Sequence, residues 1–233
     1  MKTIKFTTKN EDLIKLSPII PMREYKPQWY KDLNLNTKEA LQCPIFKKFN
    51  YNPTFPSITA KGCPAIKDYL DSGYIIPWPA EIIFQTTIIE NTRKINAYTN
   101  DSALISSHYS SQLPNLNTDF FKINSPWAIE TPKGYSCLFF QPTFFFETRY
   151  VMLPGIVDTD KHPMPVNFPG YTLNNEFKVS LNEPMICVMP FKRDEFKFKM
   201  NFSDNIVGQR YNRFSLLFKN VYKKYFWTKK KFI

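Results

Sequence analysis

Short hydrophobic runs, separated by prolines and polar turn residues, follow one another along most of this chain. Between residues 60 and 200 the runs are rich in β-branched and aromatic residues, which is typical of strands. Residues 195–202 alternate apolar and charged side chains and predict a half-buried strand. Short strands at such close spacing predict a sandwich or barrel.

Two turns in this region predict hairpins. The apolar runs 82–89 and 93–99 flank Glu90, Asn91 and Thr92, a polar break of hairpin length. The runs 125–130 and 135–142 are joined by the segment 131–134, with proline at the second and glycine at the fourth turn position. A type I turn favours this arrangement.

The hydrophobic period changes to that of a helix in two places. Pro64 suits the first turn of a helix, and Gly73 follows where a left-handed C-terminal cap is expected. After Ser203 and Asp204, apolar residues fall three and four positions apart and predict a long amphipathic helix over residues 205–227. The first 60 residues are weakly periodic, with a strand near residues 3–8 and a short helix near Pro27.

These patterns predict one mainly β structural domain with an antiparallel barrel. Residues 61–202 form the β domain, residues 1–60 an irregular N-terminal segment packed on it, and residues 203–233 a basic C-terminal helix. The 19 prolines against 6 glycines disfavour a helical bundle, because proline ends helices but is tolerated at strand ends. With 43% hydrophobic residues in 233, the chain can bury a sizeable core.

The positive charge is concentrated at the C-terminal end. Residues 201–233 hold eight basic residues against the single acid Asp204, a net charge of +7 out of +11 for the chain. An acidic partner surface would attract such a segment, although lysines near a helix C-terminus also complement the helix dipole. The candidate partner-binding residues are Arg210, Arg213, Lys219, Lys223, Lys224, Lys229, Lys230 and Lys231.

Cysteine spacing and hydropathy bear on the compartment. Cys43, Cys63, Cys137 and Cys187 lie far apart and include no Cys-x-x-Cys pair, which disfavours both a zinc knuckle and a disulfide framework. No stretch approaches the roughly 20 apolar residues of a membrane span. We therefore expect a protein that is not secreted, with reduced thiols, in the cytoplasm of a cell or in a virion.

One segment concentrates candidate chemistry. Asp158, Asp160 and His162 alternate along "GIVDTDKH", so an extended backbone would point all three to one face. Together with His108, the only other histidine, they would offer carboxylate and imidazole ligands to a divalent metal. The alternative is a polar strand end without a ligand, and no cofactor is predicted on other grounds.

Other catalytic patterns are missing from the sequence. It contains neither a G-x-S-x-G nucleophile motif nor a P-loop or G-x-G-x-x-G phosphate loop. Aromatic and basic residues interleave at 195–202 and 210–227, as in surfaces that stack bases beside phosphates. A buried helix stripe explains the second of these patterns equally well.

Three segments, "SPWAIETPKGYSCLFFQP", "LPGIVDTDKHPMPVNFPGY" and "PMICVMPFKRDEF", resemble a family of uncharacterised bacteriophage and bacterial proteins. The resemblance implies a single-domain viral or bacterial protein and assigns no activity. The order P-K-G-Y, then G-I-V-D-x-D, is also similar to the β-clip fold of the dUTPase and dCTP deaminase superfamily. By that resemblance, the fold would be β-clip-like and Asp158 would be the carboxylate that activates water.

The chain departs from the dUTPase pattern at the positions that bind phosphate and sugar. Lys161 stands where the sugar-packing tyrosine is expected, "QPTFFF" replaces the Arg-Ser-Gly motif, and a basic segment replaces the glycine-rich C-terminal arm. Binding of a triphosphate needs those donors. The resemblance therefore bears on architecture more than on activity.

Three hypotheses of function follow. The first is a non-catalytic binding or structural protein, encoded by a phage, whose basic helix engages a partner or drives self-association into a homo-oligomer. The alternative is a small-molecule or nucleotide hydrolase of dUTPase-like fold that uses Asp158. The third is non-specific binding of nucleic acid through the basic tail, with an affinity that falls steeply with salt.

Overall fold

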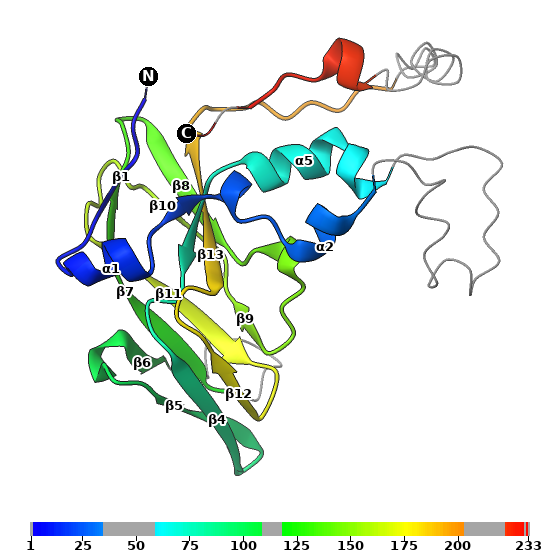
Figure 1. Ribbon diagram of the computed structural model, residues 1–233. Helices are drawn as coiled ribbons and strands as arrows, with labels where there is room; N and C mark the ends of the chain where they lie inside the picture. Colours follow the sequence, from blue (N-terminus) through cyan, green and yellow to red (C-terminus); the bar gives the residue numbers. More distant parts are fainter. Residues whose placement is uncertain (1, 35–58, 109–117, 203–221, 231, 233) are drawn as a thin grey trace, which may run out of the picture. The chain divides into compact units, whose positions relative to one another are not determined.

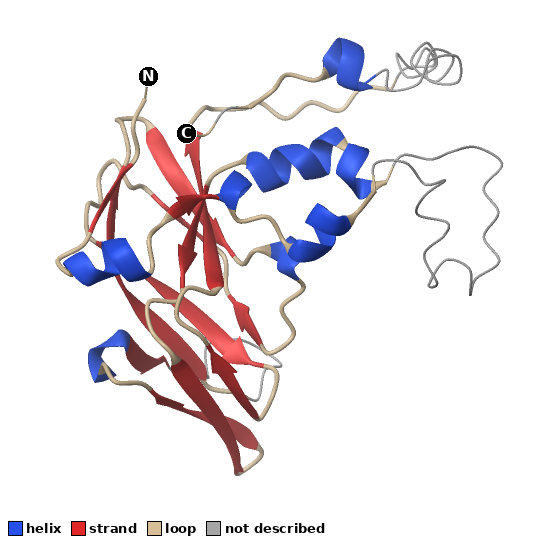
Figure 2. Ribbon diagram, viewed as in Figure 1, coloured by secondary structure: helices blue, strands red, loops and turns tan. Residues whose placement is uncertain are grey.

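A computed structural model describes residues 2–34, 59–108, 118–202, 222–230 and 232 (Figure 1). By its contacts the chain divides into two units, each built from two stretches of sequence. Unit 1 comprises Met1–Pro27 and Gly73–Arg193, and unit 2 comprises Gln28–Ser72 and Asp194–Ile233. The described strands all belong to unit 1, so the chain is mainly β, as predicted (Figure 2).

The described residues of unit 1 form three antiparallel sheets. The first is centred on β7 and consists of β1 (Lys5–Thr7), β6 (Ile105–His108), β7 (Phe120–Glu130), β11 (Pro165–Thr172) and β9 (Tyr150–Met152). The second runs in the order β10 (Gly155–Val157), β8 (Tyr135–Phe140), β13 (Pro184–Lys192), β3 (Tyr74–Pro77) and β2 (Ile20–Pro21). The third consists of β12 (Glu176–Val179), β4 (Ile82–Ile89) and β5 (Thr92–Tyr98).

The sheets are open, and none of them closes into a barrel within the described residues. The predicted barrel is therefore wrong in this respect. Aromatic side chains pack between the sheets instead. Measured between ring centroids, Phe139 of β8 lies 5.5 Å from Phe168 of β11, and Phe84 of β4 lies 4.8 Å from Phe121 of β7. Sheets that pack on one another bury their apolar faces without closure.

The hairpin predicted at residues 82–99 is confirmed. Seven residue pairs join β4 and β5, from Ile83 opposite Tyr98 to Ile89 opposite Thr92. Glu90 and Asn91 form the two-residue turn with φ of 48° and 62°. Both torsions are positive because the tight turn that matches the twist of a hairpin requires them, and asparagine tolerates this conformation well.

The hairpin predicted around residues 131–134 is wrong, and the turn itself is shifted by one residue to 132–135, where Gly134 is third and not fourth. The Tyr135 N–H donates to the Pro132 carbonyl oxygen at 3.1 Å, and Gly134 has φ +85°. The strands on either side do not pair, since β7 lies in the first sheet and β8 in the second. A turn motif reverses the chain locally, but it does not determine which neighbours the two strands pair with.

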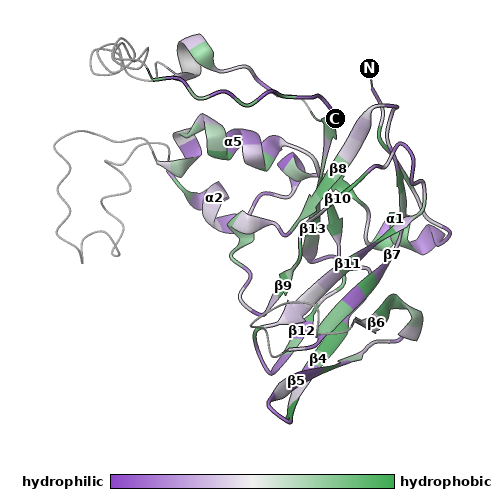
Figure 3. Cartoon of the chain, turned by 180° about the vertical axis from the view of Figure 1, so that it is seen from behind, coloured by the Kyte–Doolittle hydropathy of each residue, from purple (hydrophilic) through white to green (hydrophobic). Residues whose placement is uncertain are grey.

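The core of unit 1 follows the alternation of its strands. Along β7, the side chains of Phe121, Ile123, Trp127 and Ile129 are buried and the residues between them are more exposed. Hydrophobic residues are concentrated along β4, β7 and β8 (Figure 3). At the centre, the Trp78 indole N–H donates to the Tyr150 hydroxyl at 2.9 Å, and both residues are buried. Burial raises the pKa of Tyr150, which keeps this hydroxyl protonated.

The described residues of unit 1 also form four short helical segments. Phe6 and Leu13 from the N-terminal stretch pack on its core. The segments are α1 (Glu11–Leu16), η1 (Met22–Glu24), η3 (Ser102–Leu104) and η5 (Thr143–Phe145).

The described elements of unit 2 are all helical. They are α2 (Gln28–Asp32), η2 (Ala60–Gly62), α5 (Pro64–Asp71) and η6 (Tyr222–Phe226), whereas residues 194–202 of the same unit belong to no helix or strand. The helices predicted at Pro64 and near Pro27 are confirmed, and Gly73, with φ +82°, follows the first of them. Within this unit Asp68 of α5 accepts hydrogen bonds from the Trp227 indole at 2.9 Å and from Lys230 Nζ at 2.6 Å. The predicted helix over residues 205–227 lies mostly outside the described residues, and only the π-helical turn η6 is seen near its end.

Candidate functional site

Asp158, the residue singled out as catalytic, directly follows the edge strand β10. That strand pairs with β8 so that Val157 lies opposite Cys137. This register brings Asp158 beside Ser136 on β8, and the Ser136 hydroxyl donates to Asp158 Oδ1 at 2.7 Å. The Asp158 side chain is 47% exposed, which places it at the surface.

Arg193 links Asp158 to Asp160. Its backbone N–H donates to the Gly134 carbonyl oxygen at 2.9 Å, which holds the residue beside the start of β8. Nη1 lies 3.0 Å from Asp158 Oδ1 and 2.8 Å from Asp160 Oδ1, and Nη2 lies 2.5 Å from Asp160 Oδ2. The Gly134 N–H also donates to Asp160 Oδ2 at 2.8 Å. We call this group of four residues the Arg193 latch.

The latch holds both carboxylates in their charged form. The Arg193 hydrogen bonds, followed by that of the Gly134 N–H, lower the pKa of Asp160 to about 2. The Ser136 hydroxyl and then the Arg193 charge lower the pKa of Asp158. A carboxylate with a lowered pKa is a weak base, whereas a general base works best with a pKa near the operating pH. The arrangement suits a clamp between the end of β13 and the chain after β10 better than activation of water.

The predicted metal ligands do not form a cluster around a shared point. Asp158 and Asp160 both form ion pairs with Arg193, so their carboxylates already face a cationic group. His162 lies in the turn, where its backbone N–H donates to the Asp158 carbonyl oxygen at 2.9 Å, and His108 ends β6 in a different sheet. The parts of the chain that the structure describes contain no group of three His, Cys, Asp or Glu residues arranged to hold a metal. A metal at these four residues stays a prediction.

A second arginine of unit 1, Arg149, is also paired with acids. Its guanidinium donates to Glu147 at 2.8 and 2.7 Å and to Glu183 at 2.9 Å. These hydrogen bonds raise the pKa of Arg149 and hold the side chain in place. Beside it lies a cavity of about 200 Å³, lined also by Tyr150. The ion pairs that Arg149 makes leave it poorly placed to bind an anionic substrate.

A different feature, which we call the arm, is the segment 194–202 that follows the last strand. Its four large apolar side chains are 81–91% exposed and fall at every second position: Phe196, Phe198, Met200 and Phe202. Lys197 and Lys199 alternate with them. The half-buried strand predicted here is wrong, because the structure assigns these residues to no strand and leaves their apolar side chains in solvent.

The predicted partner-binding residues lie largely beyond the described parts of the chain. Lys223 and Lys224 fall within η6, Lys229 is exposed, and Lys230 is paired with Asp68. Those outside the described residues are Arg210, Arg213, Lys219 and Lys231. The described lysines of this group therefore include one that makes an ion pair inside its own unit.

The sequence carried signals for both features. Arg193 stands directly after an apolar strand, and two aspartates end another strand, which is the pattern of an ion pair between strand ends. The alternation at 195–202 did identify an amphipathic strand-like segment, but only the structure shows that its apolar side is exposed.

Comparison with known proteins supplies no further guide. No protein family model matches the chain, and no curated protein matches its sequence. Within the described residues, no helix is both long enough and apolar enough to cross a membrane. A functional conclusion must therefore come from the geometry of the latch and of the arm.

Proposed function

We propose that this protein is a non-catalytic structural protein that assembles with further copies of itself through the arm. The observation that carries the proposal is the row of four large apolar side chains at alternate positions, each at least 81% exposed. Burying one such side chain is worth roughly 1.5–3 kcal/mol. Exposing four of them on one segment is therefore costly, and a partner that covers them is favoured.

The alternating pattern of the arm favours an extended strand as the conformation in which a partner covers its apolar side chains. Period-two alternation places Phe196, Phe198, Met200 and Phe202 on one side of an extended chain and Lys197 and Lys199 on the other. An extended segment with one apolar side joins an existing sheet edge through main-chain hydrogen bonds and fills pockets with alternate side chains. The lysine side would remain in water.

The chemistry of the latch also supports a non-catalytic protein. Asp158 and Asp160 are both bound to Arg193, and the pKa of each is lowered, so neither is suited to abstract a proton near neutral pH. The latch instead connects strand ends close to the residue at which the arm begins, since Arg193 precedes Asp194 in sequence. In this proposal Asp158 serves stability.

Sedimentation velocity of the full chain over a range of concentrations tests the proposal. We expect the wild type to form a species larger than a monomer, and the triple variant Phe196→Ser, Phe198→Ser, Phe202→Ser to remain a monomer with an unchanged circular dichroism spectrum. The matched control is Lys197→Ser with Lys199→Ser, which changes the same segment but keeps its apolar side and should assemble like the wild type.

Measuring self-association at high salt distinguishes assembly through the apolar arm from assembly through charge attraction by the basic tail. Apolar contacts persist at high ionic strength, whereas charge attraction is screened, with a Debye length of about 3 Å at 1 M. Assembly that survives 1 M salt agrees with the proposal. A wild type that is monomeric at every concentration, or a triple variant that assembles as well as the wild type, would overturn it.

A further inference from the structure

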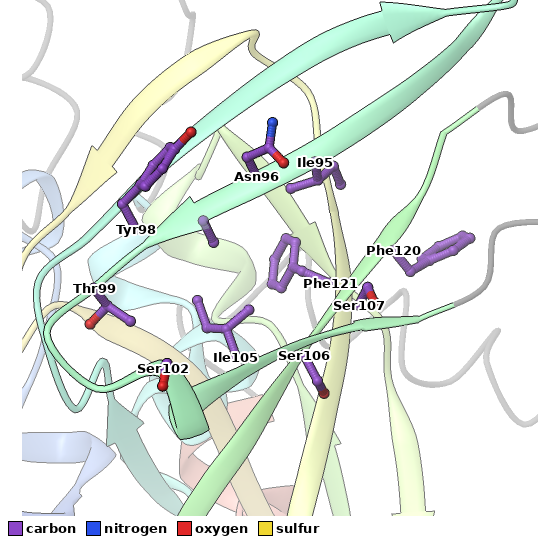
Figure 4. A pocket seen from close by; sticks show the side chains of 11 residues that line it. Ile95, Asn96, Tyr98, Thr99, Ser102, Ile105, Ser106, Ser107, Phe120 and Phe121 are labelled. Carbon is purple, nitrogen blue, oxygen red and sulfur yellow. The ribbon is translucent and has the colours of Figure 1, made fainter.

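A cavity of about 410 Å³ lies between β5 and β6 in unit 1 (Figure 4). Among the described residues β5 pairs with β4 on one side, and its other side makes only the single bridge between Arg93 and Thr118. In the same part of the chain β6 pairs with β7 alone. Within the described residues, β5 beyond Arg93 and β6 therefore each have one edge that pairs with no strand, and both strands border the cavity.

Ile95, Ile105 and Phe121 give this cavity an apolar part, and uncharged polar side chains contribute a similar share of its lining. Ile105 and Phe121 lie between the two strands, and Ser102 and Ser107 lie nearer the border (Figure 4). Ile105 packs against the hydrophobic core from a partly exposed position, as does Ile95 of β5. No charged side chain is among the lining residues. At this place the core of unit 1 reaches the surface between two sheets.

An extended chain with apolar residues on one side matches these properties. Its backbone would pair with an open strand edge, and its alternate side chains would enter the apolar part. The volume falls within the range of about 300–1,000 Å³ that is usual for ligand sites. An anionic or cationic ligand fits poorly, because it would lose its hydration without gaining an opposite charge.

We propose that the groove between β5 and β6 receives the arm of a second copy of this chain, an inference that rests on the function proposed above. The arm has the alternating apolar residues that the groove requires, and no strand pairing of its own in the described residues. Its apolar residues span 196–202, and β5 has seven residues, Thr92–Tyr98, so one strand can run along the other over a similar length. Lys197 and Lys199 would then point away from the apolar part.

Two groove substitutions test the inference in the full chain. Ser107 and Asn96 line the groove and are exposed, so Ser107→Arg with Asn96→Arg introduces charge there without disturbing buried residues. We expect the dissociation constant of self-association to rise by at least about tenfold, because a docked apolar segment would bury these charges. The control is Thr87→Arg, an exposed change on the same hairpin that does not line the groove.

Mixing the variants distinguishes this inference from the proposed function. The arm triple variant keeps an intact groove, and the groove variant keeps an intact arm, so an equimolar mixture should form heterodimers although each alone is monomeric. If the groove variant assembles like the wild type while the arm variant does not, the groove is not the docking surface and the proposed function stands. If the arm variant also assembles, both fail.

A disulfide trap locates the contact directly. After mild oxidation, Phe198→Cys mixed with Ser107→Cys should give a cross-linked dimer of the two variants, whereas Phe198→Cys mixed with Thr87→Cys should not. A disulfide formed within one chain of a Phe198→Cys, Ser107→Cys double variant that stays monomeric would overturn docking between copies, and so would the absence of cross-linking in an assembled mixture.

Discussion

At the scale of single residues, Arg193 determines the role of Asp158 and Asp160. One guanidinium satisfies oxygens of both carboxylates, and the side chain of Asp160 is only 4% exposed. Charge-assisted bonds in such a paired geometry are among the strongest polar contacts in proteins. Removing the arginine would leave an almost buried carboxylate without its counter-ion, which is a recognised cause of destabilisation.

We predict that Arg193→Met lowers the melting temperature at pH 7 more than Arg23→Met does. Arg23 pairs with Glu24, but both side chains are largely exposed, and such pairs contribute little. The folded-state pKa of Asp160 lies near 2, below the ordinary value of about 3.9. Its contribution to stability is therefore present above pH 4 and is lost as the pH falls towards 2. Thermal unfolding between pH 7 and 2 should show the difference between wild type and Arg193→Met narrowing over that window, and a constant difference would contradict the latch.

At the scale of elements, Gly73 stands between α5 and β3 with a backbone conformation and surroundings that disfavour any side chain. Its φ is +82°, and a Cβ atom there would overlap the carbonyl oxygen of Val188 on β13. The Gly73 carbonyl oxygen also accepts the Met22 N–H at 3.0 Å. Strand β3 can approach β13 at this point only because the residue before it carries no side chain.

Three glycine-to-alanine variants separate the cost of a left-handed backbone from the cost of overlap between a Cβ atom and its neighbours. Gly73→Ala should lower the free energy of unfolding by about 2–5 kcal/mol, since it combines left-handed strain with overlap. Gly134→Ala has a similar φ of +85° but open space around its Cβ, and should cost about 1–2 kcal/mol. Gly155→Ala has neither problem and should change stability by less than about 0.5 kcal/mol. Urea denaturation measures all three, and equal losses at Gly73 and Gly134 would show that overlap with Val188 is unimportant.

At the scale of the whole molecule, unit 1 contains a complete hydrophobic core. Among the described residues, the core cluster draws its members only from Met1–Pro27 and Gly73–Arg193, although the chain leaves this unit and returns to it. Ile20 of β2 pairs with Ile75 of β3, so the chain leaves unit 1 after one strand and re-enters it just before the antiparallel neighbour of that strand. A long segment inserted at such a place adds little to the entropy of closing the loop.

We therefore expect unit 1 to fold without unit 2. A chain that ends at Arg193 and carries a short glycine-serine linker in place of residues 28–72 should unfold cooperatively and keep the near-ultraviolet circular dichroism of its buried Trp78 and Trp127. A chain with the same linker that retains residues 194–233 is the control for the effect of the linker. Loss of the near-ultraviolet signal in the shortened chain alone would show that unit 1 depends on the C-terminal residues.

Local sequence determined those elements whose cause is local. The turn at Glu90 and Asn91, the helix that begins at Pro64 and the left-handed Gly73 each depend on torsional preferences of a few neighbouring residues. A mainly β chain and several of its strands could thus be predicted from the sequence.

Tertiary structure alone decided which strands pair and which charges meet. β7 and β8 are joined by a tight turn, yet they belong to different sheets, because pairing depends on strands distant in sequence. Arg193 lies 33 residues from Asp160 along the chain, so their contact could not be predicted from local sequence. The arm has the alternation of a half-buried strand, but periodicity describes only the faces of a segment. Whether a sheet covers the apolar face depends on the contacts of the whole chain.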